Sequence, residues 1–382
     1  MREFLLSIII PTKNRQYYCK NAIKQILRCT SKSVQVVVQD NSDDESLRLF
    51  CEELNSNRVV YNHHNGVISF VDNFSEAVTF ANGEYLCMIG DDDGVLPNIE
   101  TITKHALENK LDAFVPGLNA VYSWPTESPV TPGAENGYLY ITPMSSKIKK
   151  VNCKRALEKL LNRAFQDYQE TCIPRLYHGI VHHSVMEKIK AQTGCYFGGL
   201  TPDMYMSIAL GVVCEKVEHA NFPITISGIC PGSGSANSAS GAHTGELKDA
   251  PHFIGHDSYE WNKLVPYFYS VETIWAETAL HALGDMGKGD LSIRMNLAYF
   301  VSILKEKYPQ FNDRISAFAK EYKISVLWVK WSYVYRKLAR LFEKFIKLIT
   351  RYRKKRKMLF NVKSIYVAER DICKYMKKNK IR

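Results

Sequence analysis

Residues 85–97 read YLCMIGDDDGVLP, an apolar run followed by Asp91, Asp92 and Asp93 in a row. The apolar residues 85–89 are typical of a strand buried on both faces of a parallel sheet, where hydrophobicity is continuous rather than alternating. Three adjacent carboxylates repel one another unless a cation neutralises them, and Mg²⁺ or Mn²⁺ prefers such oxygen ligands together with substrate phosphates. The stretch therefore predicts a cation site at the end of a buried strand, with a solvated acidic turn as the alternative.

The chain before this stretch alternates between strand-like and helix-like patterns. The predicted strands cover residues 5–10, 34–38, 59–61 and 85–89, and the predicted helices cover residues 17–28, 44–54 and 69–81. This rhythm indicates an α/β domain with a mainly parallel sheet, in which ligands gather at the carboxyl ends of the strands. Polar clusters follow the predicted strands at residues 12–15, 40–43 and 91–93. We therefore expect one site built from three strand ends.

Charge is distributed unevenly along the 382 residues. The chain has 50 Lys+Arg and 39 Asp+Glu, which gives a formal net charge of +11. Residues 326–382 hold 19 basic and 3 acidic residues (+16), which leaves 31 basic and 36 acidic residues (−5) for the rest. The chain is therefore a mildly acidic body with a basic tail. A hydrophobic content of 46% with 23% charged residues excludes a mostly disordered, collagen-like or multi-span membrane protein.

The cysteines and the N-terminus indicate the compartment. Ten cysteines are scattered without CxxC pairs, which favours reduced thiols in the cytosol. The apolar run near the N-terminus ends at Pro11 after only seven residues, too short for a signal peptide or a spanning helix, which needs about 20. We expect a cytoplasmic protein.

Four motifs together resemble those of family 2 glycosyltransferases, which have the GT-A fold. The motifs are SIIIPTKNR at residues 7–15, VVVQDNSD at 36–43, ANGEY at 81–85 and GDDDGVLP at 90–97. They occur in the order and spacing of that family. The resemblance is close over residues 3–115 and looser over residues 170–245. It implies an α/β, Rossmann-like nucleotide-diphospho-sugar transferase domain with a helical C-terminal extension.

The resemblance also implies roles for individual residues in the donor site. Pro11 and Thr12 would line the nucleotide pocket, Asp40 would hydrogen-bond the nucleotide base, and Arg15 would approach the diphosphate.

The acidic triplet corresponds to the DxD motif of the family, although Gly90 stands where the first aspartate is usual. Within the triplet we expect Asp93 to bind the metal directly. Asp91 or Asp92 would reach the ribose or a metal-bound water, so Asp91 also belongs to the metal site.

Two further residues complete the predicted site. An inverting transfer needs a carboxylate base for the acceptor hydroxyl, and Asp203, in GGLTPD at residues 198–203, resembles the family's later acidic motif. The alternative for Asp203 is a helix N-cap. His243 lies in the Gly/Ser-rich stretch after the last predicted core strand. Related enzymes carry a metal- or diphosphate-binding His there, and an exposed loop His is the alternative.

The basic tail begins with an apolar helical stripe. Its positions alternate steps of four and three: Leu327, Trp331, Val334, Leu338, Leu341, Phe345 and Leu348. A basic amphipathic helix with Trp and Tyr suits an anionic membrane surface. The heptad-like spacing also allows packing on the body or a short coiled coil between copies, so a homo-oligomer is an open alternative. We expect no nucleic-acid partner, because attraction to phosphate alone is not sequence recognition.

We expect four parts and one activity. The parts are a GT-A domain (1–230), a flexible Gly/Ser-rich loop (231–257), a helical region (258–325) and a basic amphipathic tail (326–382). The resemblance implies an inverting, hexosyltransferase-type enzyme of surface polysaccharide or glycan biosynthesis. With Mn²⁺ or Mg²⁺ it would move a sugar from a nucleotide-diphosphate sugar to a glycan or lipid-linked acceptor at the inner face of the cell membrane. The alternative is a catalytically inactive sugar-nucleotide-binding or membrane scaffold protein.

Overall fold

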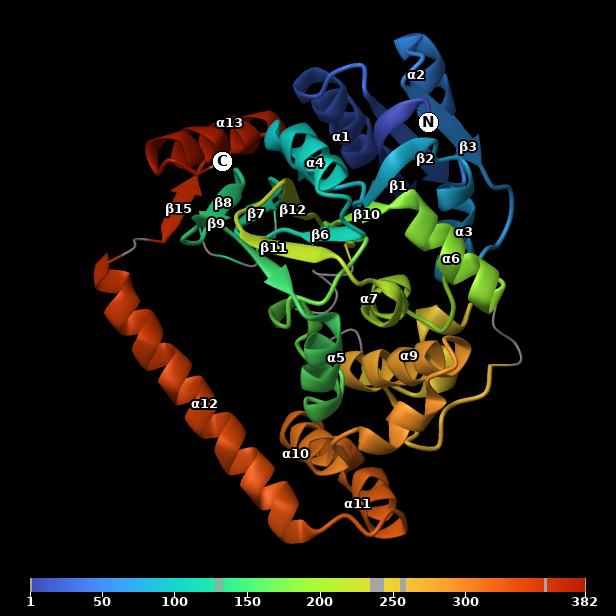
Figure 1. Ribbon diagram of the computed structural model, residues 1–382, viewed down its shortest axis with the longest axis vertical. Helices are drawn as coiled ribbons and strands as arrows, with labels where there is room; N and C mark the ends of the chain where they lie inside the picture. The colour runs from blue at the N-terminus through green and yellow to red at the C-terminus, as the bar shows by residue number, and fades with distance from the viewer. Residues whose placement is uncertain are drawn as a thin grey trace.

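The computed structural model describes residues 2–127, 129, 131, 133–233, 244–254, 259–353 and 356–381 (Figure 1). It confirms the predicted α/β class. The main sheet has the strand order β3-β2-β1-β4-β10-β6-β11-β9. Its N-terminal half is parallel and consists of β1 (Phe4–Thr12), β2 (Val34–Asp40), β3 (Val59–His63) and β4 (Gly83–Met88). Helices α1 (Gln16–Cys29), α2 (Ser46–Leu54) and α3 (Phe70–Thr79) connect these strands.

Alternating side chains of the central strands belong to two different cores. Ile9 and Val37 pack on one face with α3 and with the later helices, whereas Ile8 and Val36 pack on the other face with α1 and α2. This follows from the period of two along a strand, which sends successive side chains to opposite faces. Because both faces are covered, the strands carry continuous apolar runs, as the sequence indicates.

The second half of the main sheet is mixed. It contains β10 (Ile180–His182), β6 (Ala113–Val115), β11 (Val217–Asn221) and β9 (Ser145–Val151), with β10 antiparallel to both β4 and β6. A smaller sheet has the order β15-β8-β7-β12-β5 and contains β15 (Lys357–Phe360), β8 (Tyr138–Ile141), β7 (Ala120–Ser123), β12 (Thr225–Ile229) and β5 (Gly94–Val95). A short ribbon pairs β13 (Thr244–Gly245) with β14 (Tyr269–Ser270). The later sequence thus adds strands on both sides of the acidic triplet.

Helices surround the sheets. They are α4 (Asn98–Glu108), α5 (Cys153–Asn162), α6 (His183–Thr193), α7 (Pro202–Val213), α9 (Val271–Asp285), α10 (Leu297–Lys307), α11 (Asn312–Glu321), α12 (Val326–Arg353) and α13 (Ile365–Lys378). The predicted helical C-terminal region is confirmed by α9 to α13. Buried residues of α9 and α10 belong to the same apolar core as α7 and β4, so the helical region packs directly on the α/β domain.

The predicted tail, residues 326–382, forms two different structures. Helix α12 packs on α10 and runs along one side of the molecule, away from the sheets (Figure 1). Strand β15 then pairs with β8, and α13 buries Ile365 and Ile372 in the same core as α1 and α4. The tail is therefore one protruding helix and one integral part of the α/β domain.

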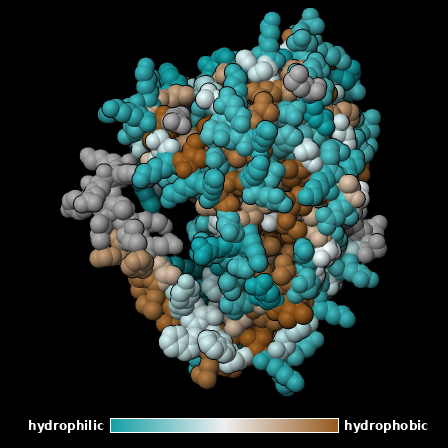
Figure 2. Space-filling view, in the orientation of Figure 1, coloured by the Kyte–Doolittle hydropathy of each residue, from teal (hydrophilic) through white to brown (hydrophobic). Residues whose placement is uncertain are grey.

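Helix α12 is held by its polar side. The Arg336 guanidinium is buried and donates to Glu306 and to the Ser302 carbonyl of α10. The opposite side is apolar and exposed, and Figure 2 shows apolar side chains along the outer edge of this helix. The exposed apolar residues are Leu327, Trp328, Trp331, Val334, Tyr335, Leu338, Leu341, Phe342 and Phe345. Among the described residues, no helix is both long and apolar enough to cross a bilayer.

Candidate active site

The ends of β1, β2 and β4 lie side by side and bring the three predicted clusters together. Thr12 is paired in register with Asp40 across β1 and β2. The Thr12 hydroxyl donates to Asp91 Oδ2 at 2.6 Å. Pro11 is also buried, in the strand position before Thr12. The parallel pairing of these strands therefore places polar side chains from three distant segments at one edge of the sheet, as predicted.

Asp91 is fully buried and faces Arg15. The guanidinium donates from Nε to Asp91 Oδ2 at 3.0 Å and approaches Oδ1 with Nη2 at 2.8 Å. Burial raises the pKa of Asp91 to about 7, although Arg15 opposes the rise. Burial alone would lower the pKa of Arg15. The charges of Asp91 and Asp92 outweigh this effect, so the pKa of Arg15 is raised. Arg15 is therefore always charged, and it is held in the site by its forked contact with Asp91.

Both carboxylate oxygens of Asp93 accept hydrogen bonds from other groups of the protein. Its Oδ1 accepts the Gly228 N–H at 2.6 Å, and its Oδ2 accepts the Gly90 N–H at 2.6 Å and the Tyr177 hydroxyl at 3.0 Å. His178 Nε2 also lies 3.4 Å from Oδ2. Burial lowers the pKa of His178 to about 3, so this imidazole is neutral. Asp93 therefore joins the acidic loop to β12 and to the segment before β10.

Gly90 leaves room for the Tyr177 hydroxyl beside Asp93. A Cβ atom on Gly90 would lie 2.7 Å from the Tyr177 hydroxyl oxygen and 3.1 Å from carboxylate oxygens of Asp92 and Asp93. A side chain at this position would displace the Tyr177 hydroxyl from Asp93. The departure from the family pattern thus accompanies the internal bonding of Asp93.

Asp92 has more free acceptor capacity than Asp93. Its Oδ2 accepts the Cys230 N–H at 3.1 Å, and its carbonyl accepts the Trp124 indole N–H at 2.8 Å. No described residue donates a hydrogen bond to its Oδ1. Burial raises the pKa of Asp92, and Asp93 raises it further. Burial thus disfavours the charged forms of all three carboxylates, and a bound cation would favour them.

Asp40 is the candidate residue at the end of β2, next to Thr12 of β1. It is buried at the end of β2, where Oδ1 accepts the Ser42 N–H at 2.9 Å and Oδ2 accepts the Tyr61 hydroxyl at 2.9 Å. Each carboxylate oxygen has a second lone pair. The carboxylate is therefore fixed in orientation and still able to accept a further hydrogen bond.

Asp203 lies in the first turn of α7. Thr201 is the N-cap residue of this helix and makes no side-chain cap, so Asp203 is not the N-cap. The Tyr168 hydroxyl donates to Asp203 Oδ2 at 2.7 Å. Burial raises the pKa of Asp203, whereas the bond from Tyr168 and backbone N–H groups of the helix start lower it. An acid whose pKa is raised toward neutrality is suited to take up a proton.

Three side chains that contact these acids have no signal in the sequence. Tyr168, Tyr177 and His178 lie outside the quoted motifs, and their partners are 35, 84 and 85 positions away in the chain. His243 lies outside the described residues. Among the described residues, no three His, Cys, Asp or Glu side chains form a cluster that could hold a metal ion. Mg²⁺, however, commonly takes one or two carboxylates and completes its shell with water and substrate phosphates.

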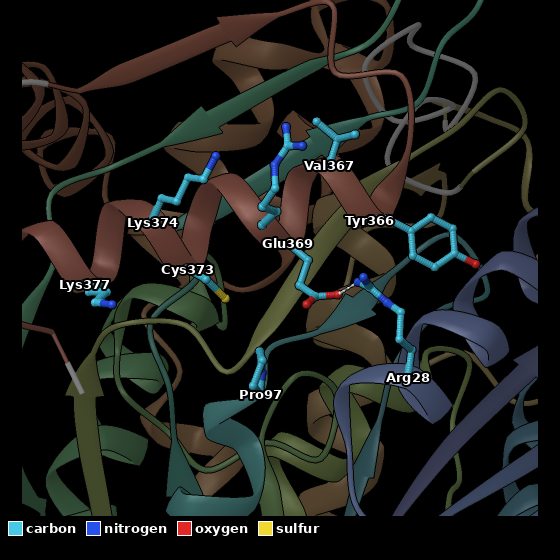
Figure 3. A pocket seen from close by; sticks show the side chains of 9 residues that line it. Arg28, Pro97, Tyr366, Val367, Glu369, Cys373, Lys374 and Lys377 are labelled. Carbon is cyan, nitrogen blue, oxygen red and sulfur yellow. Dashed lines mark hydrogen bonds and ion pairs between the residues drawn. The ribbon is translucent and has the colours of Figure 1, made fainter.

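A cavity of about 570 Å³ lies away from the acidic site, between α13, the end of α1 and the start of α4 (Figure 3). The residues lining it are Arg28, Pro97, Tyr366, Val367, Glu369, Arg370, Cys373, Lys374 and Lys377. Glu369 forms an ion pair with Arg28 across it. Because this cavity holds none of Asp91, Asp92 or Asp203, the carboxylates rather than this cavity define the candidate active site.

Comparisons with known proteins agree with the strand-end motifs. Residues 7–176, a little under half of the chain, match the family model described as Glycosyl transferase family 2. The chain is 30% identical over 136 residues to a protein of Escherichia coli named as a colanic acid biosynthesis glycosyl transferase, WcaA, covering 34% of this chain and 49% of that protein. It is 22% identical over 170 residues to the glycosyltransferase GlyG of Streptococcus pneumoniae serotype 4, covering 43% of this chain and 52% of that protein. The chain thus spans about half the length of these curated relatives.

Solved structures give a weaker likeness. Staphylococcus aureus TarS, residues 1–349, in complex with UDP-GlcNAc has a TM-score of 0.47 and 12% sequence identity, covering 86% of this chain and 78% of that one. The family model and the motifs at three strand ends carry the likeness instead. On these grounds residues 7–176 are similar to glycosyl transferase family 2.

Proposed function

We propose that this protein transfers a sugar, with inversion, from a nucleotide-diphosphate sugar to a hydroxyl group in surface polysaccharide or glycan biosynthesis. The observation that carries the proposal is the set of three buried carboxylates beside Arg15, at the strand ends where family 2 enzymes bind their donor. The names of both curated relatives agree with a glycosyltransferase, and that of WcaA agrees with polysaccharide synthesis.

A divalent cation fits the acidic loop. A cation would offset the cost of ionising these buried carboxylates, and Asp92 Oδ1 is not used by the described residues. Asp92 would hold Mn²⁺ or Mg²⁺ through Oδ1, and Asp91, whose oxygens contact Thr12 and Arg15, would lie beside the ion. Asp93, the residue favoured from the sequence, would act by fixing the loop, because both its oxygens already accept hydrogen bonds. When bound, the ion would offset the charge of the leaving nucleoside diphosphate.

The chain's own residues would perform the remaining tasks. Pro11, Thr12 and Asp40 would line the nucleotide pocket, and Arg15 would direct its positive charge toward the diphosphate. Asp203 would accept the proton of the acceptor hydroxyl as its oxygen bonds to the anomeric carbon, from the face opposite the breaking bond to the diphosphate. His243 would approach the metal or diphosphate from its loop.

The exposed apolar side of α12 would place the enzyme on a membrane. Lys330, Lys337 and Lys344 recur every seven residues along one flank of the apolar stripe. Apolar side chains with adjacent lysines suit the surface of an anionic lipid layer. We propose a cytoplasmic enzyme bound to the inner face of the cell membrane, acting on a glycan or lipid-linked acceptor.

Donor hydrolysis and binding test the activity. With Mn²⁺ we expect slow release of nucleoside diphosphate from one member of a panel of sugar nucleotides. We expect Asp92→Asn to reduce this release about a hundredfold or more, since the loss of a metal-held charge affects the leaving group directly. Asp313→Asn, an exposed acid on α11, is the matched control. Binding of a sugar nucleotide without turnover, unchanged in Asp92→Asn, would indicate an inactive binding protein and contradict the proposal.

A further inference from the structure

One segment between α5 and β10 contains an unusual concentration of left-handed backbone. Among the described residues, eleven other than glycine have a positive φ, and five of them fall within residues 164–178. They are Ala164 (50°), Phe165 (62°), Asp167 (55°), Cys172 (58°) and His178 (60°). Residues with a Cβ rarely adopt this conformation, and where they do the surrounding structure must impose it. Such clusters are a reason to ask what the segment positions.

The segment touches both acidic parts of the candidate site. Near its start, the Tyr168 hydroxyl donates to Asp203 Oδ2 at 2.7 Å. Near its end, the Tyr177 hydroxyl donates to Asp93 Oδ2 at 3.0 Å. Asp203 and Asp93 come from different elements, α7 and the loop after β4. One strained segment thus carries both Tyr168, which contacts Asp203, and Tyr177, which contacts Asp93.

Tyr168 is fixed on every side. Its side chain is buried, only 2% exposed, and packs edge-on against Trp275 with ring centroids 5.4 Å apart. Its carbonyl accepts the Thr171 N–H at 3.1 Å and the Thr171 hydroxyl at 2.7 Å. Gln169 Nε2 donates to the Tyr168 hydroxyl oxygen at 3.4 Å. The Tyr168 hydroxyl oxygen thus accepts a hydrogen bond from Gln169, and its proton points to Asp203. These two bonds fix the direction in which the hydroxyl donates.

From this geometry we infer that Tyr168 is the positioning residue for Asp203 in the transfer reaction. This inference rests on the proposed role of Asp203 as the base. Tyr168 holds Oδ2, so the acceptor hydroxyl meets Oδ1. In the step, the proton of the acceptor hydroxyl passes to the Asp203 carboxylate, the acceptor oxygen bonds to the anomeric carbon, and the nucleoside diphosphate leaves with the electron pair. Tyr168 keeps its own proton, because burial and Asp203 raise its pKa well above the ordinary value.

One neighbouring ionisable side chain shifts the pKa of Asp203, although many charged residues lie on the elements around it. Helices α3, α5, α6 and α9 pack against α7. Together with the segment before β10 they carry these charged or titratable residues: Asp72, Glu76, Cys153, Lys154, Arg155, Glu158, Lys159, Arg163, Asp167, Tyr168, Glu170, Cys172, Arg175, Tyr177, His178, His183, Glu187, Lys188, Lys190, Glu272, Glu277, His281 and Asp285. Within the described chain, Tyr168 is the ionisable side chain whose interaction alters the pKa of Asp203, and it lowers that pKa.

Replacement of Tyr168 by phenylalanine separates positioning from packing. Tyr168→Phe keeps the ring against Trp275 and removes only the hydroxyl. We expect kcat for sugar transfer to fall about ten- to a hundredfold at pH 7, from the loss of a hydrogen bond to a charged group. Since the bond lowers the pKa of Asp203, its loss raises that pKa. The acid limb of the kcat–pH profile should therefore move to higher pH, while affinity for the nucleoside diphosphate stays unchanged.

A matched control measures the cost of losing a buried tyrosine hydroxyl elsewhere. The Tyr85 hydroxyl donates to the Leu111 carbonyl at 2.8 Å, inside the other core. We expect Tyr85→Phe to lose similar stability and to keep the wild-type pH profile. A Tyr168→Phe enzyme with the wild-type profile and kcat would overturn the inference.

The variant Asp203→Asn shows whether a negative result concerns only the role of Tyr168 or the proposed function as a whole. If Asp203→Asn still transfers sugar at the wild-type rate, the base is elsewhere and the proposed mechanism is wrong. If Asp203→Asn is inactive while Tyr168→Phe behaves as wild type, the base stands and only the role of Tyr168 falls.

Discussion

Asp93 and Asp92 are neighbours in the chain and have different surroundings. Asp93 accepts two backbone N–H groups and one hydroxyl, whereas Asp92 accepts one backbone N–H group with its carboxylate. An identical side chain can therefore brace a loop at one position and remain available to a ligand at the next. The difference arises from β12 and the residue after it, which supply the Gly228 and Cys230 N–H groups about 135 residues later.

A stability measurement distinguishes the two positions. Asp93→Asn turns a side-chain amide toward one of its N–H donors, which leaves that buried donor without an acceptor. We expect the free energy of unfolding to fall by about 2–3 kcal/mol. Asp92→Asn should lose less than about 1 kcal/mol, because a single bond is affected. Urea denaturation followed by circular dichroism checks both, and equal losses would contradict this division of roles.

The sequence was sufficient to predict that the three strand-end clusters gather at one edge of the sheet, but not how each residue there is used. Thr12, Arg15, Asp40 and the triplet follow buried runs, and parallel strands carry such ends to one edge. Tyr168 and Tyr177 could not be predicted, because they reach the acids through irregular backbone in the left-handed region rather than through a repeating element.

At the scale of elements, α12 and α13 show where composition is an incomplete guide. Both are basic and amphipathic, so the sequence predicts one tail. In the structure the apolar side of α13 is covered by α1 and the smaller sheet, and the apolar side of α12 is not. What separates them is β15, whose pairing with β8 at the edge of the smaller sheet fixes where α13 lies. Pairing between strands more than 200 residues apart cannot be derived from local periodicity.

Helix α13 is connected to the strand after the acidic loop through Gln25 of α1. Gln25 of α1 accepts the Val95 N–H and donates to the Val95 carbonyl, and it also donates to Glu369 of α13. Val95 lies in β5, two residues after Asp93. A contact between the first and last helices of the described chain thus adjoins the acidic loop.

We expect damage to α13 to destabilise the whole α/β domain. Ile372 is fully buried, so Ile372→Ala should reduce the free energy of unfolding by about 2–5 kcal/mol, the usual cost of a cavity in a core. Lys374→Ala, on the exposed side of the same helix, should change it by less than about 0.5 kcal/mol. If Ile372→Ala is as mild as the lysine variant, α13 is not an integral part of the domain.

The whole molecule presents one long apolar edge to its surroundings, along α12. Leu338 and Leu341 are 58% and 60% exposed, so their replacement by aspartate should leave folding and donor hydrolysis unchanged. We expect the double variant Leu338→Asp/Leu341→Asp to bind vesicles that contain anionic lipid at least about tenfold more weakly, because burial of two leucines in the lipid interface is lost. Cosedimentation with vesicles measures this.

Ile293 provides the control for that experiment. It is 87% exposed and lies in the turn between α9 and α10, so Ile293→Asp places the same charge away from α12. Vesicle binding that survives in the double variant would contradict the membrane proposal. A wild-type protein that ignores vesicles but sediments as a dimer, which the double variant dissociates, would assign the stripe to a second copy of the chain.

The path of the chain also sets the order in which the protein can assemble. Gln25 and Glu369 are 344 positions apart, so the support behind the acidic loop forms only after the ribosome has released α13. Contacts this distant slow folding, and domains otherwise tend to form from the N-terminus as they are made. During translation, the Rossmann-like half therefore exists for a period with the α13 surface bare. A chain interrupted within α12 would carry all four strand-end motifs and still present that apolar surface to chaperones and proteases.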